Sequence, residues 1–399
     1  MELPIPEPAA RVIERLYSHG YEAYAVGGCV RDTLIGRIPN DWDVTTSAPP
    51  ERLLTLFDSP LFKAIPTGIA HGTVTVLSSG EAVEVTTFRV DGEYSDSRRP
   101  DKVSFTSSLG EDLARRDFTI NAMAYSPRCG LVDLYGGRAD LDNKLIRCVG
   151  EPERRFSEDA LRILRAPRFA SVLDFGVEDA AASAALRLRG RLDLISKERI
   201  SSELAKLIGG AGVSRVLCRF RPIIGTILPE LMRDEYDRAA SYVGRLGGSP
   251  IALQLAALFY GISPETARGA LTRLRFDKRT CSRTAMILSH IGANPASKSD
   301  VKRLASEVGT DCAGEIIALG ELCGTASPEC AGYLGEIREN DECISVSGLK
   351  INGDDLLALG VRPKQIGSLL SRLLGEVIDG RIPNERQALE AFIRDFLQA

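Results

Sequence analysis

Histidine, paired cysteines and long apolar runs are scarce in this sequence, and each absence excludes a class of protein. Only three histidines occur among 399 residues, which leaves little for histidine-based metal binding or acid–base catalysis. The nine cysteines are scattered without a Cys-x-x-Cys pair, which favours reduced thiols in a cytoplasmic protein over a disulfide framework or a zinc site. No run of about 18 apolar residues occurs, so we expect no membrane span, and the first residues lack the basic and apolar regions of a secretory signal.

Length and charge bound what remains. A chain of 399 residues with 44% hydrophobic residues predicts roughly two to four domains with packed cores. The net charge is −4, so a nucleic-acid partner would have to be bound by a local basic patch. We find no internal repeat and no low-complexity segment.

The most informative stretch is a glycine turn followed by two aspartates. An apolar run over 23–26 breaks at Gly27-Gly28, and a short helical pattern with Arg31 follows. Backbone N–H groups at such a turn can hold phosphate, although many Gly-Gly pairs are plain turns. A second strand is expected to begin near Asp41, which would put Asp41 and Asp43 on one strand face. Because close carboxylates favour a cation, and Mg²⁺ prefers carboxylates plus phosphates, the combination indicates nucleotidyl transfer rather than a solvated strand face.

The rest of the first 150 residues predicts further strands at 62–65, 73–78 and 82–89. Glu84 would project from the last of these, either as a third metal carboxylate or as a charge at the rim of the sheet. Residues 90–110 are polar and rich in turn formers, which predicts a long loop, and 111–124 predicts a helix.

From Pro152 the pattern becomes helical almost throughout, so we expect a boundary near residue 150. A helix over 157–171 would be capped by Ser157, and Pro167 should kink or end it. Four of its charged side chains would share one face: Glu158, Asp159, Arg162 and Arg165. Such a row is either a surface ion-pair row or a set of donors and acceptors that reads a base edge.

Later helices are predicted over 179–188, 197–207, 213–220, 249–260 and 264–274, the second with Arg199, Glu203 and Lys206 on its polar side. The best local basic patch is the segment 273–283, which contains Arg273, Lys278 and Arg279. It would contact RNA phosphate or form a solvated helix end. Residues 351–370 predict a helix, a turn and a helix, and the turn presents Arg362 and Lys364 beside a helix N-terminus.

Taken in order, five motifs resemble those of one family. They are Gly27-Gly28-Cys29-Val30-Arg31-Asp32 with Asp41-Trp42-Asp43; Arg115-Arg116-Asp117-Phe118-Thr119-Ile120-Asn121; Asp133 with Gly136-Gly137 and Asp140; Glu158-Asp159-Ala160-Leu161-Arg162-Ile163-Leu164-Arg165; and Glu198-Arg199-Ile200. The chain is thereby similar to class II tRNA nucleotidyltransferases, which build the 3′-terminal CCA of tRNA and are related to bacterial poly(A) polymerases.

The resemblance implies an α+β fold. Residues 1–150 would form a nucleotidyltransferase head like that of polymerase β, with a small mixed sheet and helices. An all-helical neck (151–212), body (213–325) and tail (326–399) would follow. The neck would recognise the nucleotide base, and the tail would bind tRNA.

The resemblance also implies roles for single residues. Asp41 and Asp43 would bind Mg²⁺, with Glu84 as a third catalytic carboxylate. The remaining nucleotide-binding residues would be Gly27, Gly28 and Arg31 at the triphosphate, Arg116 and Asp117 at the sugar, Asp159 and Arg162 at the Watson–Crick edge, and also Asn121, Arg165 and Arg168. Arg273, Lys278, Arg279, Arg362 and Lys364 would contact tRNA. The third motif would act as a hinge.

Alternatives remain within and outside this family. Relatives that add only CC resemble this chain but have a shortened loop, whereas Asp91-Gly92 and residues 98–100 are present in the segment 90–105, which favours an enzyme able to add A. An A-adding enzyme, a poly(A) polymerase, an antibiotic nucleotidyltransferase and an inactive RNA-binding protein are the other hypotheses. Pro167 departs from the small or branched apolar residue usual in the family. We expect the tRNA 3′ end, CTP and ATP as partners and no obligatory protein partner.

Overall fold

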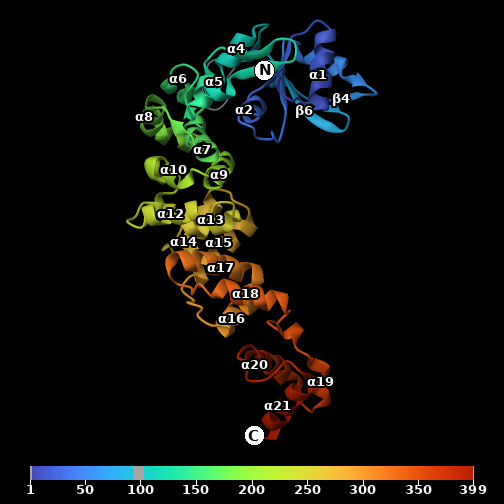
Figure 1. Cartoon of the computed structure of the whole chain (residues 1–399), viewed down its shortest axis with the longest axis vertical. Helices are drawn as coiled ribbons and strands as arrows, with labels where there is room; N and C mark the ends of the chain where they lie inside the picture. The colour runs from blue at the N-terminus through green and yellow to red at the C-terminus, as the bar shows by residue number, and fades with distance from the viewer. Residues whose placement is uncertain (1, 93–102, 399) are drawn as a thin grey trace. The chain divides into compact units, whose positions relative to one another are not determined.

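The computed structural model describes residues 2–92 and 103–398, without the side chain of the last of these. The chain divides into two compact units, Met1–Met232 and Arg233–Ala399, and each is described separately (Figure 1). The predicted boundaries near 150, 212 and 325 would subdivide these units further and stay predictions. No helix in the described ranges is long and apolar enough to cross a membrane.

The first unit begins with a mixed eight-stranded sheet in the order β10-β9-β1-β2-β6-β5-β4-β3. Its strands are β1 (Ala23–Val26), β2 (Asp43–Thr46), β3 (Asp58–Ser59), β4 (Phe62–Gly68), β5 (Thr73–Ser78), β6 (Glu81–Thr87), β9 (Met123–Ser126) and β10 (Gly130–Asp133). Only the β2–β6 pair is parallel among these strands of the described head. Every residue of β1 and β9 is buried, so both faces of the sheet are covered at these two strands.

Short helices pack on this sheet. They are α1 (Glu7–Ser18), α2 (Gly28–Leu34), α3 (Pro50–Leu56), α4 (Leu109–Ala114) and α5 (Gly137–Asp142), with 3₁₀ turns η1 (Ile69–His71) and η2 (Thr119–Asn121). α1 is amphipathic and begins after Pro6, and it contacts β1, β5 and β6 through its buried side chains. On α4, Leu109 and Leu113 pack with Tyr24, Val26 and Phe88 in one apolar cluster, which fixes α4 against the central strands.

Two predictions in the head are wrong. The helix expected over 111–124 ends at Ala114, because Phe118 bridges to Cys148 and the chain then enters the buried strand β9. The long loop expected over 90–110 is shorter, since its two ends pair as β7 (Arg89–Asp91) and β8 (Val103–Phe105). Residues 93–102 of that predicted loop lie outside the described residues.

Helices complete the first unit: α6 (Pro152–Glu158), α7 (Arg162–Leu173), α8 (Asp179–Leu188), α9 (Lys197–Ile208), α10 (Val213–Arg219) and α11 (Arg221–Ile227), with η3 (Arg189–Leu194) and η4 (Pro229–Leu231). The short strands β11 (Leu145–Ile146) and β12 (Gly176–Val177) pair in parallel beside α7.

The single helix predicted over 157–171 is wrong, because the chain turns between α6 and α7. Asp159 has extended backbone angles (φ −131°, ψ 106°), and its Oδ1 accepts a hydrogen bond from the Leu161 N–H at 3.1 Å. Ser157 therefore lies inside α6 and caps nothing. Pro167 does not end α7, which continues to Leu173.

The second unit is helical throughout its described residues. It comprises α12 (Tyr236–Arg245), α13 (Ile251–Leu258), α14 (Pro264–Arg273), α15 (Lys278–His290), α16 (Lys298–Val308), α17 (Thr310–Cys323), α18 (Cys330–Glu339), α19 (Gly353–Ala358), α20 (Ile366–Ile378) and α21 (Arg386–Gln398), with η5 (Val346–Gly348) and η6 (Pro363–Gln365). The last part has a core of its own, built from buried residues between Leu349 and Ile393. The α+β class, a mixed-sheet head followed by a largely helical part, is confirmed, but the expected all-helical neck is wrong because it contains the strand β12, which pairs with β11.

Candidate active site

The carboxylates at the start of β2 lie beside β6. Asp43 is the first residue of β2, and the parallel register places it opposite Glu84. Asp41 precedes the strand, so the prediction that one strand face carries both aspartates is wrong. Asp41 is nevertheless near enough to perturb Asp43 electrostatically. The three carboxylates thus gather at the same end of two parallel strands.

The pKa of Asp43 is raised to about 6, chiefly by burial. The negative charges of Glu84 and Asp41 also raise this pKa, and the positive charge of Arg116 lowers it. Repelling carboxylates of this kind favour a cation between them. No group of three or more His, Cys, Asp and Glu side chains that could hold a metal by themselves occurs within 2–92 and 103–398. Mg²⁺ typically takes one or two carboxylates and completes its shell with substrate phosphates and water.

We predict that Mg²⁺ affinity falls steeply as the pH drops below about 6. The pKa of Asp43 is raised to about 6, so the carboxylate form that would bind the metal predominates above that pH and becomes protonated below it. At pH 5 about nine in ten molecules would carry the proton. Calorimetric titration with Mg²⁺ and a non-hydrolysable nucleotide between pH 5 and 8 measures this. An affinity that does not change between pH 5 and 7 would contradict it.

The glycine turn is packed against an arginine. Gly27 has φ 79°, and a Cβ at this position would lie 3.0 Å from Arg116 Nη1. The positive φ favours glycine here, and a larger residue would also displace the Arg116 guanidinium. Arg31, on α2, is buried and donates from Nη1 to Asn121 Oδ1 at 2.6 Å and from Nε and Nη2 to Asp32 at 2.9 and 2.8 Å. The Gly27-Gly28 turn, Arg31 and Arg116 therefore lie together beside the carboxylate cluster.

A series of polar contacts links the glycine turn and its arginines to helix α7. Asn121 Nδ2 donates to Asp117 Oδ1 at 3.1 Å, and Arg165 Nε donates to Asp117 Oδ2 at 2.8 Å. Burial alone would raise the pKa of Asp117, but the charges of Arg165 and Arg162 hold it well below its usual range. Asp117 is therefore ionised, and its hydrogen bonds connect the head to α7.

The contacts continue from α7 to α9. Glu203 accepts from Arg168 Nε at 2.7 Å and lies 3.6 Å from Arg165 Nη1. Glu203 shares a face of α9 with Arg199, as predicted, but it is only 5% exposed and pairs with α7. The guanidinium groups of Arg31, Arg165 and Arg168 surround the Phe169 ring, at 5.1, 5.2 and 3.5 Å from its centre. One aromatic ring thus fixes arginines from both ends of the chain of contacts.

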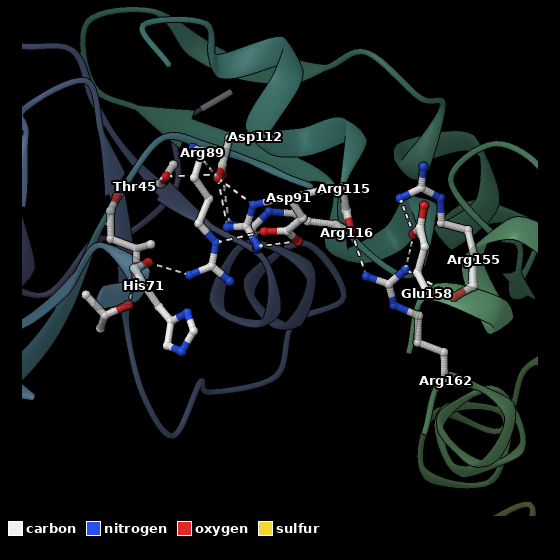
Figure 2. A network of polar contacts seen from close by, with 12 residues as sticks. Thr45, His71, Arg89, Asp91, Asp112, Arg115, Arg116, Arg155, Glu158 and Arg162 are labelled. Atoms are coloured by element: carbon white, nitrogen blue, oxygen red, sulfur yellow. Dashed lines mark hydrogen bonds and ion pairs between the residues drawn. The ribbon is translucent and has the colours of Figure 1, made fainter. Parts of the chain in front are cut away.

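The residues expected to read a base lie at the turn between α6 and α7. Arg162 donates from Nη1 to Glu158 Oε2 at 2.9 Å and from Nη2 to the Arg115 carbonyl at 2.8 Å (Figure 2). Asp159 Oδ2 accepts from Arg199 Nη2 at 3.0 Å. The backbone N–H of Arg162 donates to the Asp159 carbonyl at 3.0 Å, so the two residues adjoin across the turn although they do not share one helix.

The comparisons with known proteins agree with this geometry. Residues 23–147 match the family model described as "Poly A polymerase head domain", and residues 252–393 match that for "tRNA nucleotidyltransferase domain 2". The chain is 34% identical to the CCA-adding enzyme of Limosilactobacillus fermentum, over 98% of both chains, and 32% identical to that of Geobacillus stearothermophilus, over 99% of this chain and 98% of the relative.

The chain belongs to the CCA-adding enzymes. The crystal structure of the Bacillus stearothermophilus CCA-adding enzyme in complex with CTP covers 99% of this chain and 98% of its own, with a TM-score of 0.83 and 30% identity. The Thermotoga maritima CCA-adding enzyme complexed with tRNA shares the fold, at a TM-score of 0.70 and 22% identity, over 97% and 94% of the chains. This family implies a nucleotidyltransferase that uses a divalent metal.

The structure thus brings together the site residues predicted in the head and neck. The residues predicted to bind tRNA lie in the other unit. Lys278 and Arg279, at the start of α15, line a cavity of about 1330 Å³, and Arg362 and Lys364 are exposed at η6. Arg273 is exposed at the end of α14.

Sequence reasoning missed the roles of Phe169 and Asp112, and it gave Glu203 no partner. A signal for Glu203 was available. Arg199 and Glu203 are four residues apart on α9 and so share a face, and their partners Asp159 and Arg168 both lie in the segment around α7.

Proposed function

We propose that this CCA-adding enzyme adds C, C and A in turn to the 3′ end of tRNA, using CTP, ATP and Mg²⁺. The observation that carries the proposal is the similarity over 99% of the chain to an enzyme solved in complex with CTP. It is supported by the carboxylates Asp41, Asp43 and Glu84 beside the arginine-lined glycine turn. The presence of the segment 90–105, whose loss accompanies CC-only addition, supports addition of A.

The reaction would be an in-line displacement at phosphorus. The tRNA 3′-hydroxyl would attack the α-phosphate of the nucleotide, forming a phosphodiester, and pyrophosphate would leave. When bound, Mg²⁺ would lower the pKa of the hydroxyl and neutralise charge on the phosphates. Asp41, Asp43 and Glu84 would supply the carboxylate oxygens, while Arg31 and the N–H groups after Gly27 would bind the triphosphate. Arg116 would lie between the two groups, where it already compensates charge at Asp43.

The base would be chosen by Asp159 and Arg162. Asp159 would accept a hydrogen bond from the exocyclic amine of cytosine or adenine, and Arg162 would donate to ring acceptors. Both side chains are held in place by partners, Arg199 for Asp159 and Glu158 for Arg162. Because those partners sit on rigid helices, the pair would present a fixed pattern to the incoming base.

The proposal is tested by incubating tRNA lacking CCA, and tRNA ending in CC, with CTP and ATP separately and together, and sequencing the 3′ ends. We expect CC with CTP alone, and CCA with both nucleotides. Addition of A only to the CC-ended tRNA would instead support an A-adding enzyme, and long A tracts a poly(A) polymerase. No metal-dependent incorporation would refute the enzyme function.

We predict that tRNA contacts at η6 contribute to binding without affecting chemistry. The double change Arg362→Gln/Lys364→Gln should raise the Kd for tRNA roughly tenfold and lower the salt dependence of binding, because two exposed cations would no longer contact phosphate. Filter binding at several salt concentrations measures both. The matched control is Lys350→Gln/Arg394→Gln, which removes two exposed cations from the same part of the chain. Equal losses in both variants would contradict a specific contact.

A further inference from the structure

Asp112 is a buried carboxylate that the family motifs do not include. Its side chain is 0% exposed on α4 and receives donors from several elements (Figure 2). Oδ1 accepts from Arg115 Nε at 3.0 Å and Nη2 at 2.8 Å, and it lies 3.4 Å from the backbone N–H of Arg89. Oδ2 accepts from Arg116 Nη2 at 3.3 Å and from Thr45 Oγ1 at 3.2 Å. Burying a charge costs several kcal/mol unless it is paired, so this concentration of partners calls for an explanation.

One side of the Asp112 network lies on the sheet face of Asp43 and acts on it electrostatically. Thr45 is two residues beyond Asp43 on β2, so both side chains lie on the same face of the sheet. Arg116, held by Asp112, is the one cation among the groups that set the pKa of Asp43, and its Nη1 lies against Gly27. The position of the Arg116 guanidinium beside the glycine turn, where the triphosphate would bind, thus depends on Asp112.

The other side of the network touches the base-reading residue. Arg115 is clamped to Asp112 by two hydrogen bonds, and its backbone carbonyl accepts from Arg162 Nη2 at 2.8 Å. Arg115 also lies 3.9 Å from Asp91 on β7, which belongs to the ribbon that flanks residues 93–102. The side chains of the adjacent Arg115 and Arg116 are both held by Asp112, and the backbone carbonyl of Arg115 faces Arg162.

We propose that Asp112 is a positioning residue for nucleotide choice: it fixes Arg116 at the phosphate end of the site and, through Arg115, the carbonyl that orients Arg162 at the base end. The inference rests on the proposed function. It explains why a fully buried carboxylate is retained at α4, where an apolar residue would otherwise pack against the sheet. Removal of its charge would leave two neighbouring guanidinium groups without their shared anion.

The test is Asp112→Asn, which keeps the shape of the side chain and removes its charge. We measure kcat and KM for ATP and for CTP separately on tRNA ending in CC, below the melting temperature of each variant. We expect KM to rise for both nucleotides and the preference for ATP over CTP to fall roughly tenfold, since a charge-assisted contact of this type is worth about that factor. tRNA affinity should stay within twofold.

Glu342→Gln serves as the control for general loss of stability, because Glu342 pairs with Lys298 and Lys302 at 2.6 and 2.7 Å in the other unit. It should lower the melting temperature without changing the ATP preference. Arg115→Met is the second variant, should Asp112→Asn not fold. It keeps the backbone carbonyl but removes the clamp, so it should weaken the ATP preference in the same direction.

Two outcomes overturn the inference: an unchanged ATP-to-CTP ratio in a folded Asp112→Asn protein, or an unchanged ratio in Arg115→Met. A loss of kcat alone, equal for both nucleotides, would also refute it and assign Asp112 to stability only. The proposed function is judged separately, on what the unaltered enzyme adds to each tRNA.

Discussion

Replacing Asp43 by alanine is expected to abolish nucleotide addition while tRNA still binds. Asp43 is the most buried of the three clustered carboxylates, and Asp41 and Glu84 are close enough to raise its pKa. Without it, Mg²⁺ would lose an inner ligand and the charge on the phosphates would not be neutralised. We expect turnover to fall on the order of 10³-fold or more, as for other losses of several kcal/mol of transition-state stabilisation.

Asp41→Ala should have the same effect if both aspartates bind the metal. The matched control is Asp58→Ala, which removes an exposed aspartate from β3 at the edge of the same sheet and should leave turnover unchanged. Turnover is followed by incorporation of labelled nucleotide, and tRNA affinity by filter binding. Full activity in Asp41→Ala or Asp43→Ala would refute the metal assignment.

The glycine turn and the carboxylates were accessible from sequence because their chemistry is local. Gly27 and Asp43 are separated by one short helix, and the break after 23–26 showed where β1 ends. The predicted start of the second strand, near Asp41, was wrong. Whether Asp41 belongs to β2 depends on where pairing with β6 begins, and that pairing brings in Glu84 from about 40 residues away in sequence.

The two wrong helix predictions, over 111–124 and 157–171, have the same cause, namely contacts with residues distant in sequence. Residues 111–124 have helical periodicity, yet Met123 and Ala124 belong to the sheet because β9 pairs with both β1 and β10. Local propensity is a weak prior where a central strand position is at stake. In the neck, the periodicity of 157–171 gives no sign of the break at Asp159. The Asp159 side chain accepts from the Leu161 N–H and pairs with Arg199, and these two contacts end one helix before the next begins.

Buried charges were the least predictable feature. Asp112, Asp117 and Glu203 each have a partner that is distant in sequence or on another element, so no spacing rule identifies all of them. Sequence reasoning treats a charge in a helix as solvated, since that is the usual case. In this chain Asp117 and Glu203 pair with arginines of α7, and Asp112 pairs with the two arginines just before Asp117, so all three lie near the candidate site.

Replacing Arg162 by alanine is expected to loosen the choice between CTP and ATP more than it weakens tRNA binding. Arg162 has its guanidinium fixed by Glu158 and by the Arg115 carbonyl, beside Asp159. An arginine that reads a base edge with two hydrogen bonds discriminates by about 1–3 kcal/mol. The preference for the correct nucleotide should therefore drop by roughly 10- to 100-fold.

The control for Arg162→Ala is Arg154→Ala. Arg154 also pairs with Glu158, at 3.1 Å, but its side chain is 74% exposed. If the loss of selectivity came from disturbing Glu158, both variants would show it; if Arg162 reads the base, only Arg162→Ala would. Misincorporation is measured by sequencing tRNA ending in C or CC after reaction with mixed nucleotides. Unchanged nucleotide selectivity in Arg162→Ala would refute the reading role, and would leave the arginine as a tie between the head and the turn before α7.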